Sequence, residues 1–217
     1  MKNTIIFDLD GTLLDTLTDL TGSVNFCMEQ CGYPQYTRED VRNMVGNGIY
    51  LLMERALPGG RENPDYDRSI QLFTEHYKEH MLDATCPFPG IMDMLQKLKQ
   101  QGLKLAIVSN KFDAAVKGLN QRFFSDFIEV AIGESPNVRK KPAPDSVLEA
   151  IRELGTTMKD SIYVGDSEVD IQTAHNAGIP CLSVSWGFKS KEFLKAHGAD
   201  HIFHTAEQLL DFIVKAD

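Results

Sequence analysis

The sequence lacks the features that mark membrane proteins, disulfide-rich secreted proteins and nucleic-acid-binding proteins. No apolar run approaches the roughly 20 residues of a membrane-spanning helix, and we expect no signal peptide before the first apolar run. Only 4 cysteines occur among 217 residues, without the spacing of a zinc site, so we expect reduced thiols. The 22 basic and 31 acidic residues give a formal net charge of -9. This charge disfavours nucleic acid and membrane surfaces as partners, because both are anionic.

These absences favour a cytoplasmic protein with a small-molecule partner, and the sequence leaves open whether the protein is a monomer or a homodimer. Several short apolar runs are present instead, namely TIIFDL, KLAIVSN, FIEVAIG, SIYVGD and PCLSVSW. Amphipathic segments such as GIMDMLQKLKQQG lie between them and have helical spacing. Strands that alternate with helices predict an α/β fold with a doubly wound parallel sheet covered on both faces. Three methionines, Met92, Met94 and Met158, are expected to fill its core.

One region interrupts this alternation. Residues 16–83 contain no convincing apolar strand and show helical periodicity throughout. Within it, TREDVRNMVGNG opens with a possible capping box, from Thr37 to Asp40. The sequence therefore predicts an α/β core of residues 1–15 and 84–217, with an all-helical insertion at residues 16–83.

Polar side chains stand where the predicted strands end, or in the loops that follow. They are Asp8, Asp10, Thr12, Ser109, Asn110, Lys141, Asp166 and Asp170. In open parallel α/β sheets, ligands bind beyond the carboxyl ends of the strands, so these side chains are expected to converge there.

Each of these residues also has a plain structural interpretation. Asp8 and Asp10 could belong to an Asx-type turn before Gly11. Asp166 could precede a helix N-cap, and Asp170 could be a solvated helix residue. Lys141 could be part of an exposed basic run. Only the convergence of all of them at one sheet edge favours a site.

Four motifs, DLDGT, SN, KPAP and GDSEVD, follow one another in the sequence. In these motifs and their order the sequence resembles the haloacid dehalogenase-like hydrolase superfamily, and within it the phosphoglycolate phosphatase-like members. The resemblance covers essentially the whole chain, and the helical insertion stands where the family has its cap. The resemblance implies a Rossmann-like core and magnesium-dependent hydrolysis of a small phosphate monoester through an aspartyl-phosphate intermediate. Phosphoglycolate is the substrate that it favours most.

The chemistry of phosphate esters gives these residue types a role. The charged oxygens of the ester repel an anionic nucleophile, and Mg²⁺ held by carboxylates relieves that repulsion. On the family pattern, Asp8 is the nucleophile, and Asp10 donates a proton to the leaving alcohol and later accepts one from water. The implied magnesium ligands are Asp8, Asp10 through its carbonyl, and Asp166, with Asp170 in the outer shell. The implied phosphate-binding residues are Thr12, Ser109, Asn110 and Lys141.

Substrate choice is expected to come from the cap and from the residue after the second motif. Arg42 could meet an anionic substrate tail, and Gly46 and Gly48 would permit close backbone approach. Lys111 is a second candidate for the anionic tail. Arg42 could equally be a surface residue or part of a salt bridge within the cap.

Two other functions are compatible with such motifs. A phosphomutase of the beta-phosphoglucomutase type would return the phosphoryl group to a sugar instead of to water. A signalling module phosphorylated on aspartate would also combine acids, a hydroxyl and a lysine around magnesium, but the helical insertion and the order of DLDGT disfavour it. The acid at Asp10 favours phosphoryl chemistry over dehalogenation.

Overall fold

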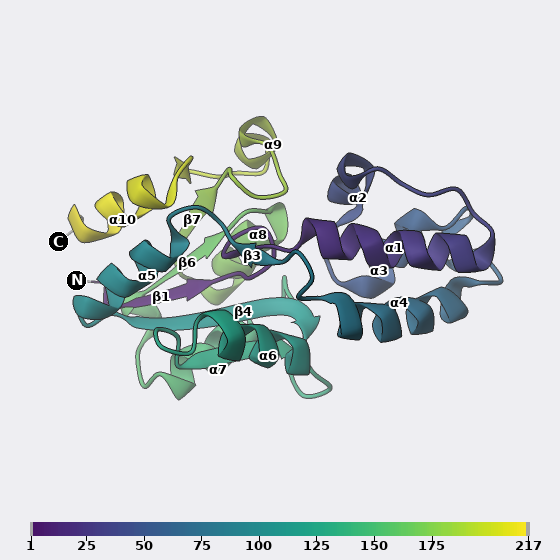
Figure 1. Ribbon diagram of the computed structural model, residues 1–217. Helices are drawn as coiled ribbons and strands as arrows, with labels where there is room; N and C mark the ends of the chain where they lie inside the picture. The colour runs from purple at the N-terminus through teal and green to yellow at the C-terminus, as the bar shows by residue number, and fades with distance from the viewer. Residues whose placement is uncertain (1, 216–217) are drawn as a thin grey trace. The chain divides into compact units, whose positions relative to one another are not determined.

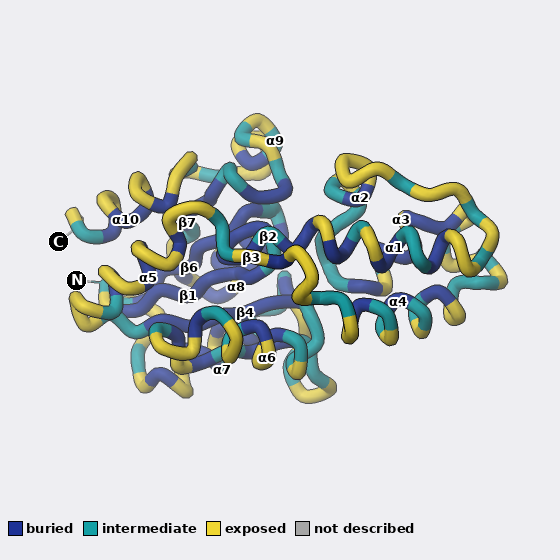
Figure 2. The backbone as a smooth tube through the Cα atoms, viewed as in Figure 1, coloured by how far each residue is buried: buried dark blue, intermediate teal, exposed yellow. Residues whose placement is uncertain are grey.

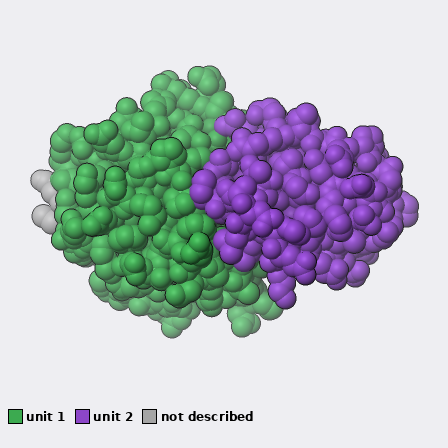
Figure 3. Space-filling view, in the orientation of Figure 1, with its two compact units in different colours: residues 1–14, 87–217 green, residues 15–86 purple. Residues whose placement is uncertain are grey.

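The computed structural model describes residues 2–215 and divides into two compact units. One unit, called here the α/β unit, comprises residues up to 14 and from 87 onward, and the helical unit comprises residues 15–86 (Figure 3). Among the described residues, no helix has both the length and the apolarity that crossing a membrane requires.

A six-stranded parallel sheet forms the centre of the α/β unit (Figure 1). The strand order is β5-β4-β1-β6-β7-β8, and every neighbouring pair is parallel. The strands are β1 (Thr4–Phe7), β4 (Lys104–Phe112), β5 (Val130–Glu134), β6 (Ser161–Gly165), β7 (Cys181–Val184) and β8 (Ile202–Phe203). The predicted doubly wound sheet is thus confirmed, and the short edge strand β8 is an addition that the sequence pattern did not indicate.

Both faces of the sheet are covered by helices, as the alternation along β1 requires. Ile5 and Phe7 belong to a buried cluster with side chains of α5 (Ile91–Gln100), α6 (Asp113–Phe123) and α10 (Ala206–Lys215). Ile6 belongs to a second cluster, with α7 (Asp145–Glu153) and α8 (Glu168–Ala177). The strands are accordingly buried along most of their length (Figure 2). The short elements η2 (Met158–Asp160) and α9 (Lys191–Ala196) complete the unit.

The order of the strands fixes where a site can form. From β1 the chain passes to β4 and β5 on one side, and then returns to β6 on the other side of β1. The connections on the two sides of β1 therefore leave in opposite directions. This is the switch point at which open α/β sheets have a crevice beyond the carboxyl ends of the strands.

The helical unit is built from α1 (Leu17–Cys31), α2 (Arg38–Met44), α3 (Ile49–Ala56), η1 (Gly60–Glu62) and α4 (Tyr66–His80). The predicted capping box is present at the start of α2, where the Asp40 N–H donates to Thr37 Oγ1 at 3.2 Å and the Thr37 N–H donates to Asp40 Oδ2 at 2.9 Å. Buried apolar side chains such as Val24, Met28 and Phe73 line the interior.

Two chain segments connect the units, and they pair with each other as a small two-stranded sheet of β2 (Leu14–Asp15) and β3 (Cys86–Pro87). The sequence pattern did not indicate this pairing. Just before β3, the buried carboxylate of Asp19 on α1 accepts hydrogen bonds from the N–H groups of Ala84 and Thr85, each at 2.9 Å. This carboxylate ties the end of the helical segment back to its first helix.

The expectation for the methionines was right for one residue and wrong for two. Met94 is 1% exposed, whereas Met92 and Met158 are 38% and 48% exposed. The phase of α5 explains the difference, because its buried residues are Ile91, Met94, Leu95 and Leu98, and Met92 lies outside that stripe.

Candidate active site

The loop after β1 places Asp8 at the switch point. The Asp8 N–H donates to the Val164 carbonyl of β6 at 2.9 Å, so the ladder between the two strands continues to this residue. The chain then turns at Gly11, whose φ of +86° is in the left-handed region that glycine adopts readily. The Trp186 indole N–H donates to the Thr12 carbonyl at 2.9 Å and holds the far side of the turn.

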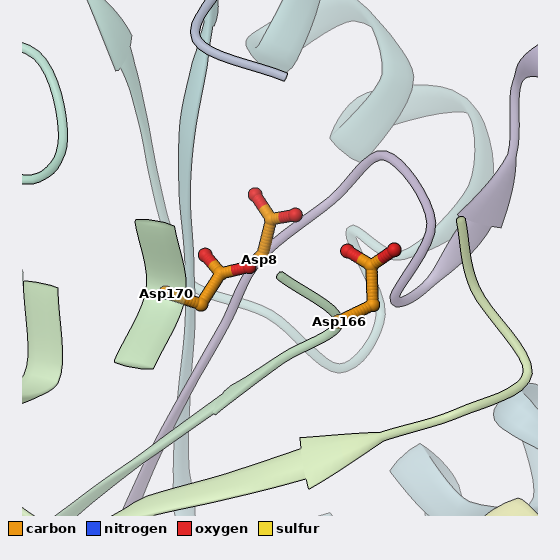
Figure 4. Close-up of side chains that lie close together, drawn as sticks. All are labelled: Asp8, Asp166 and Asp170. Atoms are coloured by element: carbon orange, nitrogen blue, oxygen red, sulfur yellow. The ribbon is translucent and has the colours of Figure 1, made fainter. Parts of the chain in front are cut away.

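Three carboxylates gather beside this turn. Ligand oxygens of Asp8, Asp166 and Asp170 all lie within 4.8 Å of one another, and all three residues are buried (Figure 4). Asp166 directly follows β6, and Asp170 lies on the first turn of α8. The sequence-based expectation that these strand ends converge holds for the three residues.

Lys141 supplies the positive charge of the cluster. Its Nζ donates to Asp8 Oδ1 at 2.7 Å, to Asp170 Oδ1 at 2.8 Å and to the Tyr163 hydroxyl at 3.0 Å. An ammonium group has three N–H donors, so these three acceptors use all of them. Lys141 is only 4% exposed and is therefore no member of an exposed basic run.

Asp170 is fully engaged by neighbouring groups. Its Oδ1 accepts from Lys141 and from the Tyr163 hydroxyl, the latter at 3.0 Å. Its Oδ2 accepts from the Ser167 N–H at 3.1 Å and from the Ser167 hydroxyl at 2.6 Å, which closes the N-terminal turn of α8. Because these four hydrogen bonds occupy both oxygens, Asp170 is better suited to orient Lys141 than to bind a metal directly.

The end of β4 carries the second motif through an irregular stretch of strand. Its pairing register with β5 shifts between Val108 and Phe112, as happens at β-bulges near active sites. The buried Asn110 side-chain amide forms two hydrogen bonds with the backbone of Lys141. It accepts from the Lys141 N–H at 2.7 Å and donates to the Lys141 carbonyl at 3.0 Å. Asn110 therefore fixes the segment that carries Lys141. The neighbouring Ser109 is buried, and its hydroxyl accepts from the Lys111 N–H at 3.2 Å.

Two glycines pack directly against the Asp166 carboxylate. A Cβ at Gly11 would lie 2.4 Å from Asp166 Oδ2, and a Cβ at Gly187 would lie 2.4 Å from the same oxygen and 2.1 Å from the Gly11 carbonyl. The Phe188 N–H donates to Asp166 Oδ2 at 2.6 Å, and the Thr12 hydroxyl lies 3.5 Å from Oδ1. No side chain larger than hydrogen fits at either glycine without displacing the carboxylate.

The buried charges shift one another's ionisation. Burial raises the pKa of Asp8 to about 7, and Asp170 adds to the effect of burial while Lys141 opposes it. Burial also raises the pKa of Asp166 well above its usual range, assisted by the charges of Asp170 and Asp8. Burial alone would lower the pKa of Lys141, but Asp170 and Asp8 raise it well above its usual value. The ammonium is therefore charged at neutral pH, and the cluster carries more acid than base.

This donor set fits a magnesium ion. The cluster offers buried carboxylate oxygens of Asp8 and Asp166, which are hard ligands of the kind Mg²⁺ prefers. Burial and the neighbouring acids raise the pKa of both groups in spite of the Lys141 ammonium, and a divalent cation beside them would lower both pKa values. The chemistry of the donors is thus consistent with a metal at Asp8 and Asp166.

Asp10 points to a different partner. Lys111 Nζ lies 2.9 Å from Asp10 Oδ1 and 3.0 Å from Oδ2. The side chains of Lys111 and Asp10 are 7% and 18% exposed, so the pair is largely shielded from solvent. The two residues that the sequence assigned to proton transfer and to substrate recognition are thus joined to each other.

The predicted specificity residues of the insertion all lie in the helical unit. Arg42 is on α2, with its guanidinium 3.5 Å from a carboxylate oxygen of Glu39. Gly46 and Gly48 lie between α2 and α3, with φ of +127° and +84°, and Asn47 between them has φ of +65°. Three successive residues with positive φ form an unusual loop, which favours the glycines there.

Sequence reasoning missed the groups that hold the acids in place. Tyr163 has no distinguishing signal within SIYVGD, where it fits an ordinary buried strand, yet its hydroxyl contacts both Lys141 and Asp170. Trp186 and Phe188 could be interpreted from the sequence either as packing near a strand end or as lining the site, and in the structure Trp186, Gly187 and Phe188 all lie against the turn or the Asp166 carboxylate.

The buried carboxylates and the lysine thus lie at the switch point of a parallel α/β sheet, which is where open sheets of this type bind their ligands. The family model described as haloacid dehalogenase-like hydrolase matches residues 5–184, so the chain belongs to this family and is an enzyme of the hydrolase class.

Similar proteins from several bacteria share most of the chain. A phosphoglycolate phosphatase of Caulobacter vibrioides is 35% identical over 93% of this chain and 86% of its own length. A phosphoglycolate phosphatase of Pseudomonas putida is 34% identical over 95% of this chain and 78% of its own length. A crystal structure from Lactobacillus delbrueckii subsp. bulgaricus, assigned as a phosphoglycolate phosphatase, has a TM-score of 0.95 at 38% identity and covers 98% of this chain and 99% of that one.

These findings confirm the family resemblance and decide against the signalling module, since the chain belongs to a family of hydrolases. They also confirm that the fold is that of the family's α/β core.

Proposed function

We propose that the chain is a magnesium-dependent phosphatase of small phosphate monoesters and that phosphoglycolate is its preferred substrate. The observation that carries the proposal is the buried contact of Lys141 with Asp8, at 2.7 Å, beside the carboxylate of Asp166. The relatives that are phosphoglycolate phosphatases, at 34% and 35% identity, support the choice of substrate.

Magnesium would be held by the carboxylates of Asp8 and Asp166 and by the backbone carbonyl of Asp10. When bound, the ion neutralises charge on the phosphoryl oxygens and so reduces their repulsion of an anionic nucleophile. Asp170 would stay outside the first set of ligands, because its oxygens already accept four hydrogen bonds.

In the first step, a carboxylate oxygen of Asp8 attacks phosphorus and the bond from phosphorus to the ester oxygen breaks. The leaving oxygen takes a proton from Asp10, so an alcohol departs and an acyl phosphate remains on Asp8. In the second step, water attacks the same phosphorus and gives its proton to Asp10. The bond from phosphorus to Asp8 then breaks, which releases phosphate and restores both side chains.

The transferring group needs donors for its oxygens. Lys141, the Ser109 hydroxyl and the backbone N–H groups after Asp8 would supply them. Thr12 and Asn110 would contribute indirectly, because the Thr12 hydroxyl faces Asp166 and the Asn110 amide holds the backbone of Lys141.

Residues 15–86 would serve as the cap that selects the substrate and excludes water during the first step. In this proposal Arg42 and the loop of Gly46 and Gly48 provide specificity. We further propose a cytoplasmic location, which suits the four free cysteines, and no nucleic-acid or membrane partner, given the net charge of -9. A monomer or a homodimer is compatible with this function.

The test is phosphate release by the purified protein from phosphoglycolate and a panel of sugar phosphates, with and without Mg²⁺. We expect release that requires Mg²⁺, is greatest with phosphoglycolate and is lost in Asp8→Asn. Failure to release phosphate from any ester would refute the proposal. Interconversion of sugar phosphates that needs a bisphosphate, with little free phosphate, would identify a phosphomutase instead.

A further inference from the structure

The ion pair of Lys111 and Asp10 has a geometry suited to holding a carboxyl group still. Both oxygens of Asp10 lie within 3.0 Å of the same ammonium nitrogen. A carboxyl group held at both oxygens cannot rotate freely about its last bond, whereas a single hydrogen bond leaves that rotation open. The pair is also largely buried, so water competes weakly for it.

Lys111 itself is fixed by the end of the central sheet. It belongs to β4, and its N–H donates to the Ser109 hydroxyl at 3.2 Å. Asp10, in contrast, lies in the turn after β1. The ammonium therefore connects a residue of a loop to a strand that neighbours β1 in the sheet.

We propose that Lys111 is a positioning residue that fixes the carboxyl group of Asp10 for proton transfer to the leaving oxygen. The inference rests on the proposed function, in which Asp10 is the acid of the first step. Proton transfer requires the two oxygens to lie within hydrogen-bond distance in the correct orientation, and small displacements are costly. Lys111 acts on the reaction through Asp10 and needs no contact with the substrate.

This role differs from the anion receptor that the sequence suggested for Lys111, and the two roles predict different substrate dependence. A receptor for an anionic tail matters only for esters that carry such a tail. A residue that positions the acid matters for every ester with a poor leaving group, since an alkoxide must be protonated as it departs. It matters little when the leaving group is already stable as an anion.

The experiment compares three substrates in the wild type, Lys111→Met and Lys111→Arg. Phosphoglycolate and ethyl phosphate both release alkoxides, but only phosphoglycolate carries a carboxylate, and p-nitrophenyl phosphate releases a stable phenolate. We expect Lys111→Met to lower kcat about 10²-fold on both alkyl esters, near the lower limit for general acid catalysis, and less than about fivefold on the aryl ester. KM should change little, and Lys111→Arg should recover most of the loss.

Lys117→Met provides the matched control. Lys117 is paired with Asp113 at 2.6 Å on α6, and its side chain is 63% exposed. Like Lys111→Met, this substitution removes a lysine and its ion pair, and it lies only six residues from Lys111 in the sequence. For all three esters, kcat should stay at the wild-type value.

Two patterns would overturn the proposal. Equal loss on all three esters would indicate a general structural role for Lys111. A rise in KM confined to phosphoglycolate would restore the anion receptor. A wild type that releases no phosphate from any ester would instead refute the proposed function, so the two failures are distinguishable.

A double variant keeps the test decisive if Lys111→Met fails to fold with Asp10 left unpaired. In Asp10→Asn the carboxylate that Lys111 holds is absent, so adding Lys111→Met should change kcat on phosphoglycolate less than about threefold. A further loss of about tenfold or more in this background would show that Lys111 acts by another route and would overturn the proposal.

Discussion

The two units of the molecule treat charged side chains differently. At the sheet edge of the α/β unit, Asp8, Lys141, Asp166 and Asp170 are all buried and contact one another or the same partners. In the helical unit, ion pairs such as Arg38 with Asp15 and Arg61 with Glu54 lie on the surface, with arginine side chains 50% and 63% exposed. Among the described residues of the helical unit, the buried acid is Asp19, and its carboxylate accepts hydrogen bonds from backbone N–H groups.

This difference separates two tasks. Buried charges in contact are expensive for stability and are retained where chemistry needs them, whereas exposed ion pairs contribute little and tolerate change. We therefore expect substitutions of buried acids to affect the rate in the α/β unit and the free energy of unfolding in the helical unit. The following predictions test this comparison, in order of decreasing expected effect.

The largest effect is expected for Asp8→Asn. Removing the proposed covalent nucleophile should lower kcat by roughly 10⁴-fold or more. The fold should persist, because the amide keeps the size of the side chain and removes one of the buried negative charges. Steady-state phosphate release and thermal unfolding measure the two properties on the same samples. Activity within tenfold of the wild type would remove Asp8 from the role of nucleophile.

The stability of metal-free protein should depend on pH through Asp8. Its pKa is raised from 3.8 to about 7 in the fold by burial, so the folded group keeps its proton where the unfolded chain has lost it. Its contribution to stability is complete below about pH 4 and is lost as the pH rises through about 7. In EDTA, the free energy of unfolding should therefore fall across this window by up to a few kcal/mol, given about 1.4 kcal/mol per unit of pKa shift.

Mg²⁺ should reverse this loss, because in the proposed function it binds the ionised carboxylates of the native state. Thermal unfolding with Mg²⁺ and with EDTA, at pH values on both sides of the window, measures the effect. Stabilisation by Mg²⁺ should be greater at the higher pH, and Asp8→Asn should flatten the slope in EDTA. A slope that is identical in Asp8→Asn would assign the titration to another group.

Asp19→Ala tests the buried acid of the helical unit. The substitution leaves the N–H groups of Ala84 and Thr85 without their acceptor, so the free energy of unfolding should fall by about 2 kcal/mol. At a temperature well below unfolding, kcat should stay within about threefold of the wild type, because the lost bonds hold structure only. Denaturant titration and phosphate release provide the two measurements, and a large loss of kcat without loss of stability would contradict the separation of tasks.

The smallest effect is expected from removing one tyrosine hydroxyl, and the change in kcat should differ between the two units. Tyr163→Phe removes the hydroxyl that contacts Lys141 and Asp170, and kcat should fall about tenfold, as expected for a hydrogen bond to a charged group. Tyr36→Phe in the helical unit removes a hydrogen bond to the Ala56 carbonyl at 2.6 Å and should leave kcat unchanged. Equal kcat values for the two variants would show that the Tyr163 hydroxyl only supports the fold.

The sequence predicts the α/β unit well because its signals are local and repeated. Apolar runs that end in acids mark both the strands and the residues that meet at their ends, and Asp8 and Asp166 follow directly from them. The capping box at Thr37 was equally predictable from the sequence, because both of its residues lie within one helical turn.

What the sequence could not predict depends on contacts between distant residues. The Tyr163 hydroxyl gains its importance from Lys141 and Asp170, and Lys141 precedes it by 22 residues in the chain. The contact of Lys111 with Asp10 spans 101 residues, and the packing of Gly187 on the Asp166 carboxylate needs the sheet to be assembled first. The exposure of Met92 could have been predicted from the sequence, because the helical spacing of its apolar neighbours already places it outside the buried stripe.

The three hydrogen bonds of Lys141 also bear on how the product leaves. An incoming oxyanion can bind this ammonium only by taking the place of an acceptor that is already there, and the neutral phenol of Tyr163 is the weakest of the three. Inorganic phosphate would then replace the neutral phenol, while the carboxylates of Asp8 and Asp170 stay bound to the same ammonium. We expect the negative charges of these two carboxylates to repel a bound phosphate anion, which favours rapid release of the product.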